Sequence, residues 1–461
     1  MSLLASVALQ IEIRVTQTAA VVMQLAIGVT QIVIEMSPIG SGASLVAFLP
    51  PLVQNQALPV MPPTSRRARL IALLVSTAVS LLVAEAALRI AGVSNPNFYG
   101  PDPERGWGLR PGAHGRWTKE GDAEVRINRD GMRDEEHPVA KPPGEVRIAV
   151  LGDSCVESLQ VPAEKTFWAL LETELARCPA VAGRKVQALD FGVSGYGTAQ
   201  ELLTLRHRVW KYDPDLVLLA FYSGNDVRNN WRPLELDPAR PYLMPRPDGS
   251  LAVDDSFRAS EGYRFRQTAA ARLVYWAFDH SRFMQLGKQA KTSLDGWVGA
   301  WRASRVKERP AGAELGLDDA VYKPPADPEW TGAWTATEAI LISARDEAAA
   351  RRTPFAVVSL TTGMQVHPDP AVRQAFMKRL GTGTLFYPDE RLAAFGQREG
   401  IPVLTLAPAL QRIAEREKVF LHGFPDTAPG EGHWNERGHA AAAAEMAGWV
   451  CRRLGGTGTA P

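Results

Sequence analysis

The sequence has few cysteines, no excess of either charge and none of the short motifs that mark nucleotide or metal sites. Cys155, Cys178 and Cys451 are its only cysteines. They are too few and too scattered for a disulfide framework or a metal cluster, and their odd number leaves at least one thiol free within a monomer. Lysine plus arginine total 51 and aspartate plus glutamate 50 in 461 residues. This balance excludes a dominant basic field for binding nucleic acid. No zinc-finger spacing, Walker loop or glycine-rich dinucleotide fingerprint occurs, so we expect no cofactor.

A single long apolar run, residues 66–92, predicts a membrane anchor. The stretch between Arg69 and Arg89 carries one charge, Glu85. At about 1.5 Å per residue, a helix over residues 70–88 just crosses a hydrocarbon core of about 30 Å. Arginines cluster before the run, which predicts a cytoplasmic N-terminus and places everything after the run on the extracytoplasmic side. A cleaved signal peptide is the alternative.

Residues 1–65 fit this plan less well. Residues 15–34 are uncharged and long enough to span a membrane, but glutamine and threonine dilute them, and a proline-rich linker follows. This extension is either a second membrane segment or a start placed too early, since Met61 lies just ahead of the arginines.

Beyond a neck rich in glycine and proline (residues 93–144), which we expect to be largely irregular, the pattern becomes that of an α/β domain over residues 145–455. Apolar strands alternate with segments of helical periodicity, which predicts a parallel, flavodoxin-like sheet in a three-layer α/β/α sandwich. Residues 227–329 break the alternation and read as an insertion, either a lid or a membrane-proximal flap, with a helix near 267–303. The expected strands are 146–153, 185–193, 215–226, 354–360 and 401–406, and the expected helices 165–178, 198–212, 334–351, 388–399 and 436–453.

Polar residues and glycines follow the predicted strands at the sheet edge where ligands bind in such folds. Ser154 follows the first strand in "GDS", Gly195 the second in "GVSGYG" and Asn225 the third in "GND", while His433 precedes the last helix in "GEGHWNERGH". Acyl transfer needs a hydroxyl nucleophile, a base, a carboxylate to orient the base and donors for an oxyanion. These residue types therefore suit acyl transfer.

The spacing assigns a role to each residue. Ser154 is the predicted nucleophile and His433 the base. Glu431, two residues before the histidine, is expected to orient the imidazole, with Asp426 as the reserve acid. The predicted oxyanion donors are the backbone N–H groups of Ser154 and Gly195 and the side-chain amide of Asn225.

Three alternatives compete with Ser154 as nucleophile. The serine could merely cap the helix that follows it. Cys155 could react instead, although a small buried hydrophobe is the usual role for such a residue. Ser194 lies in "GVSGYG", which narrowly misses the G-x-S-x-G pattern and would still need a base.

Together the four blocks resemble the SGNH (GDSL-like) hydrolase superfamily over residues 145–455, outside the insertion. The resemblance implies an esterase that acts on an oxygen ester through an acyl-enzyme. The apolar helix, the neck and "INRDGMR" are similar to a membrane-anchored bacterial branch of that superfamily. One departure stands out: family members commonly place an aspartate two or three residues before the histidine, where this chain has Glu431 and Gly430.

The resemblance leaves the function open among three classes. The substrate is a small ester or an acylated glycan if the protein is an esterase. The same residues would serve an O-acyltransferase or deacetylase acting on an exported polysaccharide or envelope glycan. A non-catalytic binding module on the same fold is the third class.

Overall fold

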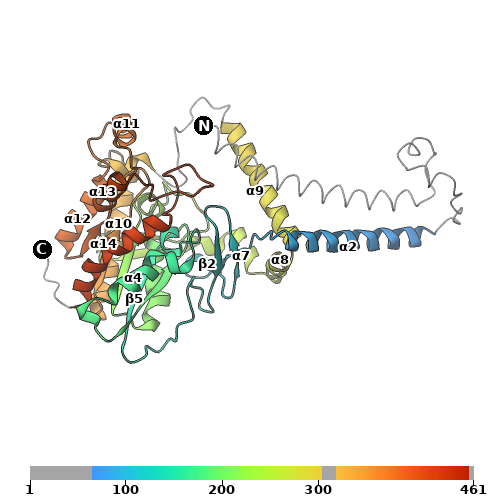
Figure 1. Cartoon of the computed structure of the whole chain (residues 1–461), viewed down its shortest axis with the longest axis horizontal. Helices are drawn as coiled ribbons and strands as arrows, with labels where there is room; N and C mark the ends of the chain where they lie inside the picture. Colours follow the sequence, from blue (N-terminus) through green and yellow to red (C-terminus); the bar gives the residue numbers. More distant parts are fainter. Residues whose placement is uncertain (1–64, 304–317, 456–461) are drawn as a thin grey trace. The chain divides into compact units, whose positions relative to one another are not determined.

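The computed structural model describes residues 65–303 and 318–455, which fall into two units (Figure 1). The first unit contains the described residues up to Ser94 together with His280–Ser293, and the second contains Asn95–Asp279 and the described residues from Leu294 onward. The N-terminal extension, with its predicted second membrane segment or early start, lies outside the described residues.

The main element of the first unit is α2 (Arg66–Ile90), which Ser65 caps by accepting a hydrogen bond from the backbone N–H of Ala68. Among the described residues it is the one helix long and apolar enough to cross a membrane. Its leucines and valines from Leu70 to Val83 are exposed, whereas Leu88 near its end is buried. A core helix of a soluble protein would bury such side chains against protein.

The chain returns to the end of α2 at the start of α9 (Arg282–Ala303). Glu85 accepts hydrogen bonds from the hydroxyl of Ser281, at 3.1 Å, and from the backbone N–H of Arg282, at 3.0 Å. Arg89 donates to the backbone carbonyl of His280 at 2.6 Å. These bonds fix residues 280–282 against the last two turns of α2.

The neck is more regular than the sequence predicts, because it forms two antiparallel hairpins. The first pairs β1 (Tyr99–Asp102) with β2 (Gly106–Leu109), and the second pairs β3 (His114–Trp117) with β4 (Ala123–Arg126). They share a small apolar core with the loops that follow the sheet strands. Its buried members are Phe98, Leu109, Val125, Ile127, Leu159, Val193 and Tyr196.

The main domain has the predicted α/β fold. Its five strands all run parallel in the order β11-β10-β7-β5-β6, which is the flavodoxin-like arrangement. The first strand, β5, lies inside the sheet, with β6 as an edge strand on one side of it and β7, the middle strand, on the other. The strands are β5 (Glu145–Gly152), β6 (Lys185–Gly192), β7 (Leu216–Phe221), β10 (Phe355–Ser359) and β11 (Val403–Thr405).

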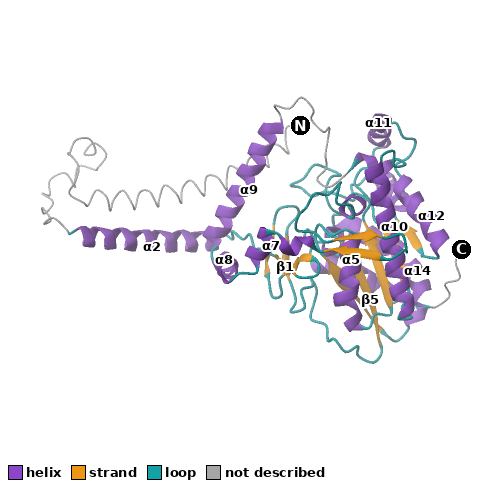
Figure 2. Ribbon diagram, turned by 180° about the vertical axis from the view of Figure 1, so that it is seen from behind, coloured by secondary structure: helices purple, strands orange, loops and turns teal. Residues whose placement is uncertain are grey.

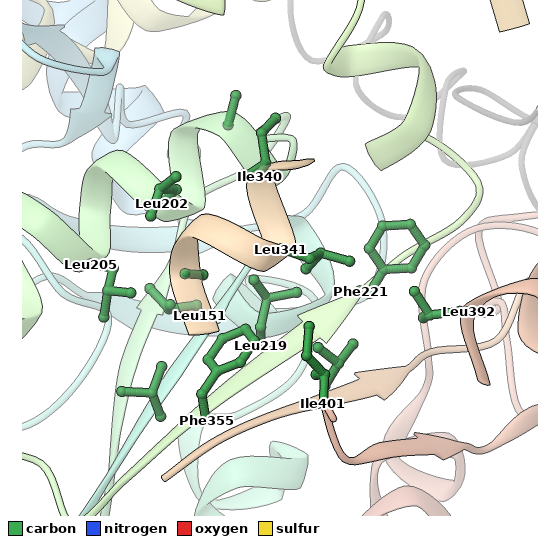
Figure 3. Packing of buried hydrophobic residues seen from close by; sticks show 14 of the residues in the cluster. Leu151, Leu202, Leu205, Leu219, Phe221, Ile340, Leu341, Phe355, Leu392 and Ile401 are labelled. Carbon is green, nitrogen blue, oxygen red and sulfur yellow. The ribbon is translucent and has the colours of Figure 1, made fainter. Parts of the chain in front are cut away.

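Both faces of the sheet are covered, which explains why its strands are almost continuously apolar. Figure 2 shows the strands between helices on either side. Leu151 and Leu219 point to one face, where they pack with Leu202 and Leu341 (Figure 3). That face carries α5 (Thr198–Thr204), α10 (Pro328–Ala350) and α12 (Tyr387–Glu399), and the other carries α4 (Phe167–Leu175), α13 (Ala407–Glu417) and α14 (Glu436–Leu454).

The insertion between β7 and α10 contains a short hairpin and several helices. The helix predicted near residues 267–303 is two helices, α8 and α9. Two further helices of the main domain, α11 (Pro370–Leu380) and α13, were not predicted. The described elements of the insertion are β8 (Tyr242–Pro245), β9 (Leu251–Asp254), α7 (Glu261–Arg266), α8 (Ala269–His280) and α9.

One disulfide joins Cys178 to Cys451, with their Cα atoms 5.6 Å apart. The two residues are 273 positions apart in sequence, but α4 and α14 pack side by side, and the disulfide links the segment after α4 to the end of α14. The three cysteines form no multiple-disulfide framework, but two of them form this single bond. Cys155 is the free, buried thiol.

Candidate active site

Ser154 lies where the interior strand β5 gives way to a short helix. Every residue of β5 is buried, and the strand ends at Gly152. Asp153 then caps α3 (Ser154–Glu157), its carboxylate accepting a hydrogen bond from the backbone N–H of Cys155 at 2.8 Å. The cap fixes Ser154 as the first helical residue, at the carboxyl edge of the sheet.

Two hydrogen bonds connect Ser154, His433 and Glu120 in a line. The Nε2 atom of His433 lies 2.8 Å from the Ser154 Oγ, and its Nδ1 atom lies 2.6 Å from Oε2 of Glu120. The other carboxylate oxygen of Glu120 accepts the backbone N–H of His433, also at 2.6 Å. Since a carboxylate can only accept, Nδ1 carries the proton and Nε2 is free to accept the proton of the serine hydroxyl.

The predicted acids, Glu431 and Asp426, do not occupy this position. The prediction was wrong because Gly430 and Gly432 both have positive φ, so the chain turns on each side of Glu431 and leaves its side chain exposed. Asp426 is also exposed and accepts a hydrogen bond from the backbone N–H of Gly121, at 3.1 Å. It therefore braces the turn that carries Glu120 rather than contacting the imidazole.

The neck supplies Glu120 from the turn between β3 and β4. The indole of Trp117 donates to the backbone carbonyl of Glu120 at 3.0 Å, which holds the tip of the hairpin. Glycine is required at position 432, because the carboxylate of Glu120 lies very close to the backbone of that residue. A Cβ atom there would lie 2.2 Å from Oε1 of Glu120, and the backbone φ of +87° disfavours any side chain.

The charges of the site support a histidine base with an ionised partner. Burial alone would lower the pKa of His433, but the hydrogen bond and the negative charge of Glu120 outweigh it, so that pKa is raised. Burial would likewise raise the pKa of Glu120, yet its bonds to His433 lower it. Each group thus stabilises the charged form of the other.

A second histidine holds the loop that carries His433. His422 is buried and donates from Nδ1 to the carbonyl of Gly432 at 2.7 Å, with its Nε2 3.0 Å from the hydroxyl of Thr361. Burial lowers its pKa to about 4, so it stays neutral near pH 7. Asn435 caps α14, its side chain accepting hydrogen bonds from the N–H groups of Arg437 and Gly438.

Asn225 connects the end of β7 to the end of β5. Its side-chain amide donates to Asp153 at 2.9 Å. An amide nitrogen carries two hydrogens, so this bond positions Asn225 while leaving the second N–H for a ligand. The bond crosses the point where the strand order reverses, which is where open α/β sheets bind their ligands.

The neck also holds the peptide that precedes Gly195. The carbonyl of Ser194 accepts a hydrogen bond from the indole of Trp107 at 3.1 Å. A second neck residue, Tyr99, donates from its hydroxyl to the carboxylate of Glu157 at 2.8 Å. Burial raises the pKa of Glu157 to about 7, although the bond from Tyr99 lowers it.

The main domain fixes the other side of this loop. Gly195 has a φ of +77°, and its carbonyl accepts from the buried guanidinium of Arg240 at 2.7 Å. The carbonyl is thus occupied, and the loop that carries the predicted N–H donor is fixed from both sides.

The structure supports neither alternative nucleophile. Cys155 is buried, and burial raises the pKa of its thiol well above the usual range, which disfavours the reactive thiolate. The Nε2 atom of His433 bonds the hydroxyl of Ser154, not that of Ser194. A further histidine, His439 of α14, is buried and accepts the backbone N–H of Phe167 at 3.1 Å, as a structural residue would.

The structure thus brings together Ser154, His433 and Asn225 and replaces the predicted acid with Glu120. Among the residues the structure describes, no group of three or more His, Cys, Asp or Glu side chains is arranged to hold a metal ion. Glu120 has no motif around it, so sequence reasoning missed it. The only signal was negative: the position three before His433, where an aspartate is common in the family, is a glycine.

No family model matches the chain, and no curated protein matches it. Similar solved structures include the acetyl xylan esterase AlAXEase, with 11% identity and a TM-score of 0.34 over 66% of this chain and 100% of that one. A putative lipolytic protein of the G-D-S-L family from Desulfitobacterium hafniense DCB-2 has 10% identity and a TM-score of 0.31, over 67% and 99%. A catalytic mutant of Axe2, an acetylxylan esterase from Geobacillus stearothermophilus, has 10% identity and a TM-score of 0.31, over 67% and 94%. Likenesses this distant add nothing to the geometry of the site.

Proposed function

We propose that this protein is a serine ester hydrolase with the triad Ser154–His433–Glu120. The observation that carries the proposal is the unbroken line of hydrogen bonds from hydroxyl to imidazole to carboxylate. A serine that merely capped a helix would not need a histidine base at 2.8 Å or a carboxylate behind that base.

In the first half of the reaction, the Ser154 oxygen attacks the carbonyl carbon of an ester while its proton passes to Nε2 of His433. The carbonyl oxygen becomes an oxyanion in the tetrahedral intermediate. The intermediate then breaks the bond to the alcohol oxygen, which leaves with the proton from Nε2. The products of this half are the free alcohol and an acyl group on Ser154.

In the second half, water replaces the alcohol. His433 takes a proton from the water as its oxygen attacks the acyl carbon, and the second tetrahedral intermediate breaks to release Ser154. The proton on Nε2 returns to the serine oxygen. The carboxylic acid leaves, and the site is restored.

Glu120 would act by orienting and stabilising the histidine. Its bond to Nδ1 selects the tautomer with a free Nε2, and its charge stabilises the imidazolium that forms in each half-reaction. Because it also binds the backbone N–H of His433, it fixes the loop as well as the ring.

The oxyanion would be held by the backbone N–H groups of Ser154 and Gly195 and by the amide of Asn225. The bond from Asn225 to Asp153 and the bonds that fix the Ser194–Gly195 peptide support this assignment, because oxyanion donors act best when they are held in place before the reaction.

The four sequence blocks add a second, independent line of support. Gly-Asp-Ser, the glycine block, Gly-Asn-Asp and the final histidine occur in the order typical of SGNH hydrolases. Ser154, Gly195 and Asn225 each follow a strand of the parallel sheet at the edge where this fold binds ligands.

We also propose that α2 anchors the enzyme with its catalytic domain on the extracytoplasmic side. The exposed apolar surface of α2 and the arginines at its N-terminal end support this orientation. The Cys178–Cys451 disulfide supports it independently, because such bonds persist in oxidising compartments. Protease digestion of sealed membrane vesicles of each orientation would test it, and a catalytic domain protected in right-side-out vesicles would contradict it.

Hydrolysis of p-nitrophenyl acetate and butyrate by the full chain in detergent tests the catalytic proposal. Ser154→Ala should abolish both the activity and labelling by a fluorophosphonate, while Ser194→Ala should keep both. Activity retained in Ser154→Ala would contradict the assignment. No activity and no labelling of the wild type would instead favour a binding module.

A further inference from the structure

We propose that α7 and α8 form a docking surface for anionic lipid headgroups of the membrane that α2 is proposed to span. The inference rests on that anchoring and goes beyond the esterase activity. The docking surface consists of the apolar side chains Phe265, Leu273 and Trp276 and the basic side chains Arg266 and Arg272.

Helix α8 has two different faces. Ala271 is buried, and Tyr275 and Phe278 are half-buried on the side that packs against the protein. Leu273 is 65% exposed and Trp276 58% exposed. At about 100° per residue these two lie within one apolar stripe, turned away from Ala271 and Phe278. An amphipathic helix with tryptophan and leucine on its exposed face is typical of helices that lie in a membrane interface.

An arginine-rich hollow of about 340 Å³ lies beside this helix. Two of its arginines, Arg105 and Arg208, share an ion pair with Asp102, with N–O distances of 2.6 and 3.0 Å. The remaining cationic side chains that line it are Arg110, Arg266 and Arg272.

Two of these remaining arginines are uncompensated. Arg110 is paired with Asp279, at 3.0 Å. Arg266 and Arg272 are exposed and make no ion pair with any described residue. Guanidinium groups bind phosphate oxygens in a bidentate manner, so the hollow suits the phosphate of an anionic lipid.

The path of the chain identifies the membrane as the occupant. The last residue of α8, His280, is itself bonded to Arg89 near the end of α2. The second connection is the segment from Ile90, the last residue of α2, to Asn95, the first residue of the second unit. These five residues span at most about 17 Å. Chain continuity at both connections therefore limits how far α8 can lie from the end of α2. A lipid surface is therefore the neighbour that this face meets at high effective concentration.

A fluorescent probe on α8 tests the proposal in the full chain. Leu273→Cys is labelled with an environment-sensitive fluorophore and reconstituted in phosphatidylglycerol vesicles that contain lipid-borne quenchers. Leu236→Cys is the matched control, because Leu236 is an 81% exposed leucine of the insertion that lies outside α7 and α8. The wild type gives the labelling background, since Cys155 is buried and the other cysteines are paired.

We expect the probe at position 273 to shift to the blue and to be quenched several-fold more than the probe at 236. The effect should weaken in phosphatidylcholine vesicles. Arg266→Gln with Arg272→Gln should lower the docked-to-undocked ratio by roughly twenty-fold, since each arginine near an anionic surface strengthens attachment by about fivefold.

Equal quenching at both positions would overturn the proposal. So would a blue shift at 273 that lipid-borne quenchers do not affect, because protein rather than lipid would then cover the face. If the chain fails to float with vesicles, the anchor proposal fails and the docking proposal with it. None of these readouts depends on ester hydrolysis, so an inactive enzyme would leave the outcome readable.

Discussion

The neck (residues 93–144) and the sheet domain (residues 145–455) contribute to one site in opposite ways. The sheet domain supplies Ser154, Gly195, Asn225 and His433, each in a recognisable motif beside a regular element. The neck has four strands of four residues each and no motif around Glu120, yet it supplies that residue. The comparison teaches that a parallel sheet places the nucleophile and the base, while a small accessory hairpin can complete the triad.

The two regions also differ in what holds them. The sheet domain is held by two large apolar clusters, one on each face of the sheet. The neck has one small cluster, and much of its attachment is polar, through Tyr99, Trp107 and Glu120. Each of these side chains bonds a part of the site. Changes in the neck should therefore affect catalysis more than stability, and changes in the sheet core should do the reverse.

The largest expected effect is on catalysis, and it distinguishes Glu120 from Glu431 as the acid of the triad. Glu120→Gln keeps the shape of the side chain but removes its charge and allows the wrong histidine tautomer. It should lower kcat/KM by roughly 10³- to 10⁴-fold. Glu431→Gln is the matched control and should stay within about twofold, because that side chain is exposed. Steady-state hydrolysis of p-nitrophenyl acetate gives both values, and a larger loss in Glu431→Gln would reverse the assignment.

Gly432→Ala should damage the contact between the two regions. The new methyl group would lie 2.2 Å from Glu120 Oε1, so the carboxylate must move, and we expect a loss of roughly 10²-fold in kcat/KM. Gly400→Ala is the control, because that glycine also has positive φ but has open space around it. It should lower stability by about 1 kcal/mol and leave kcat/KM unchanged. Equal activity in both variants would show that the close approach does not matter.

Removing the disulfide should affect only the sheet domain. Cys178→Ser with Cys451→Ser opens a cross-link over 273 residues, and we expect the free energy of unfolding to fall by about 2–5 kcal/mol. The kcat of the folded fraction should not change, because neither residue is near the site. Denaturant titration and active-site labelling measure the two quantities. A loss of kcat at unchanged stability would contradict the separation of roles.

A smaller effect on kcat tests whether the neck supports the loop that carries Ser194 and Gly195. Trp107→Phe removes the 3.1 Å bond to the carbonyl of Ser194 but keeps an aromatic ring. We expect kcat to fall by roughly fivefold with little change in KM, since a neutral hydrogen bond contributes about 1 kcal/mol. Trp276→Phe is the control and should have no effect on kcat. A change in KM alone would mean that Trp107 contacts the substrate instead.

The smallest effect is a shift in pH dependence. Glu120 raises the pKa of His433, and the base works only when the imidazole is neutral, so activity is lost as the pH falls through that raised pKa. Removing the carboxylate lowers the pKa. The acid limb of kcat/KM should therefore move to lower pH in Glu120→Gln. An acid limb that stays in place or moves to higher pH would show that Glu120 does not set the protonation of His433.

The sequence was sufficient to predict the sheet and to indicate the proposed nucleophile, and the reason is local. The motif around Ser154 adjoins a buried strand whose apolar run identifies it, and His433 precedes a helix that Asn435 caps. Side chains at the ends of adjacent parallel strands must lie near one another, so their grouping could be predicted without coordinates.

Glu120 could not be found in this way. It is 313 residues from His433, and its position depends on how the β3–β4 hairpin packs on the main domain, which no periodicity reveals. Glu431 looked suitable because it is close in sequence. The positive φ angles at Gly430 and Gly432 turn it away, and nothing in the residues around His433 fixes those angles before the chain folds.

A double-mutant cycle between Glu120→Gln and His433→Ala tests most directly whether the neck completes the triad. If Glu120 acts only through His433, adding Glu120→Gln to His433→Ala should cost no further activity, although each change alone is severe. Rates of hydrolysis for the four proteins, all checked for the same thermal stability, give the coupling. Losses that multiply in the double variant would contradict the account, because Glu120 would then act independently of the histidine.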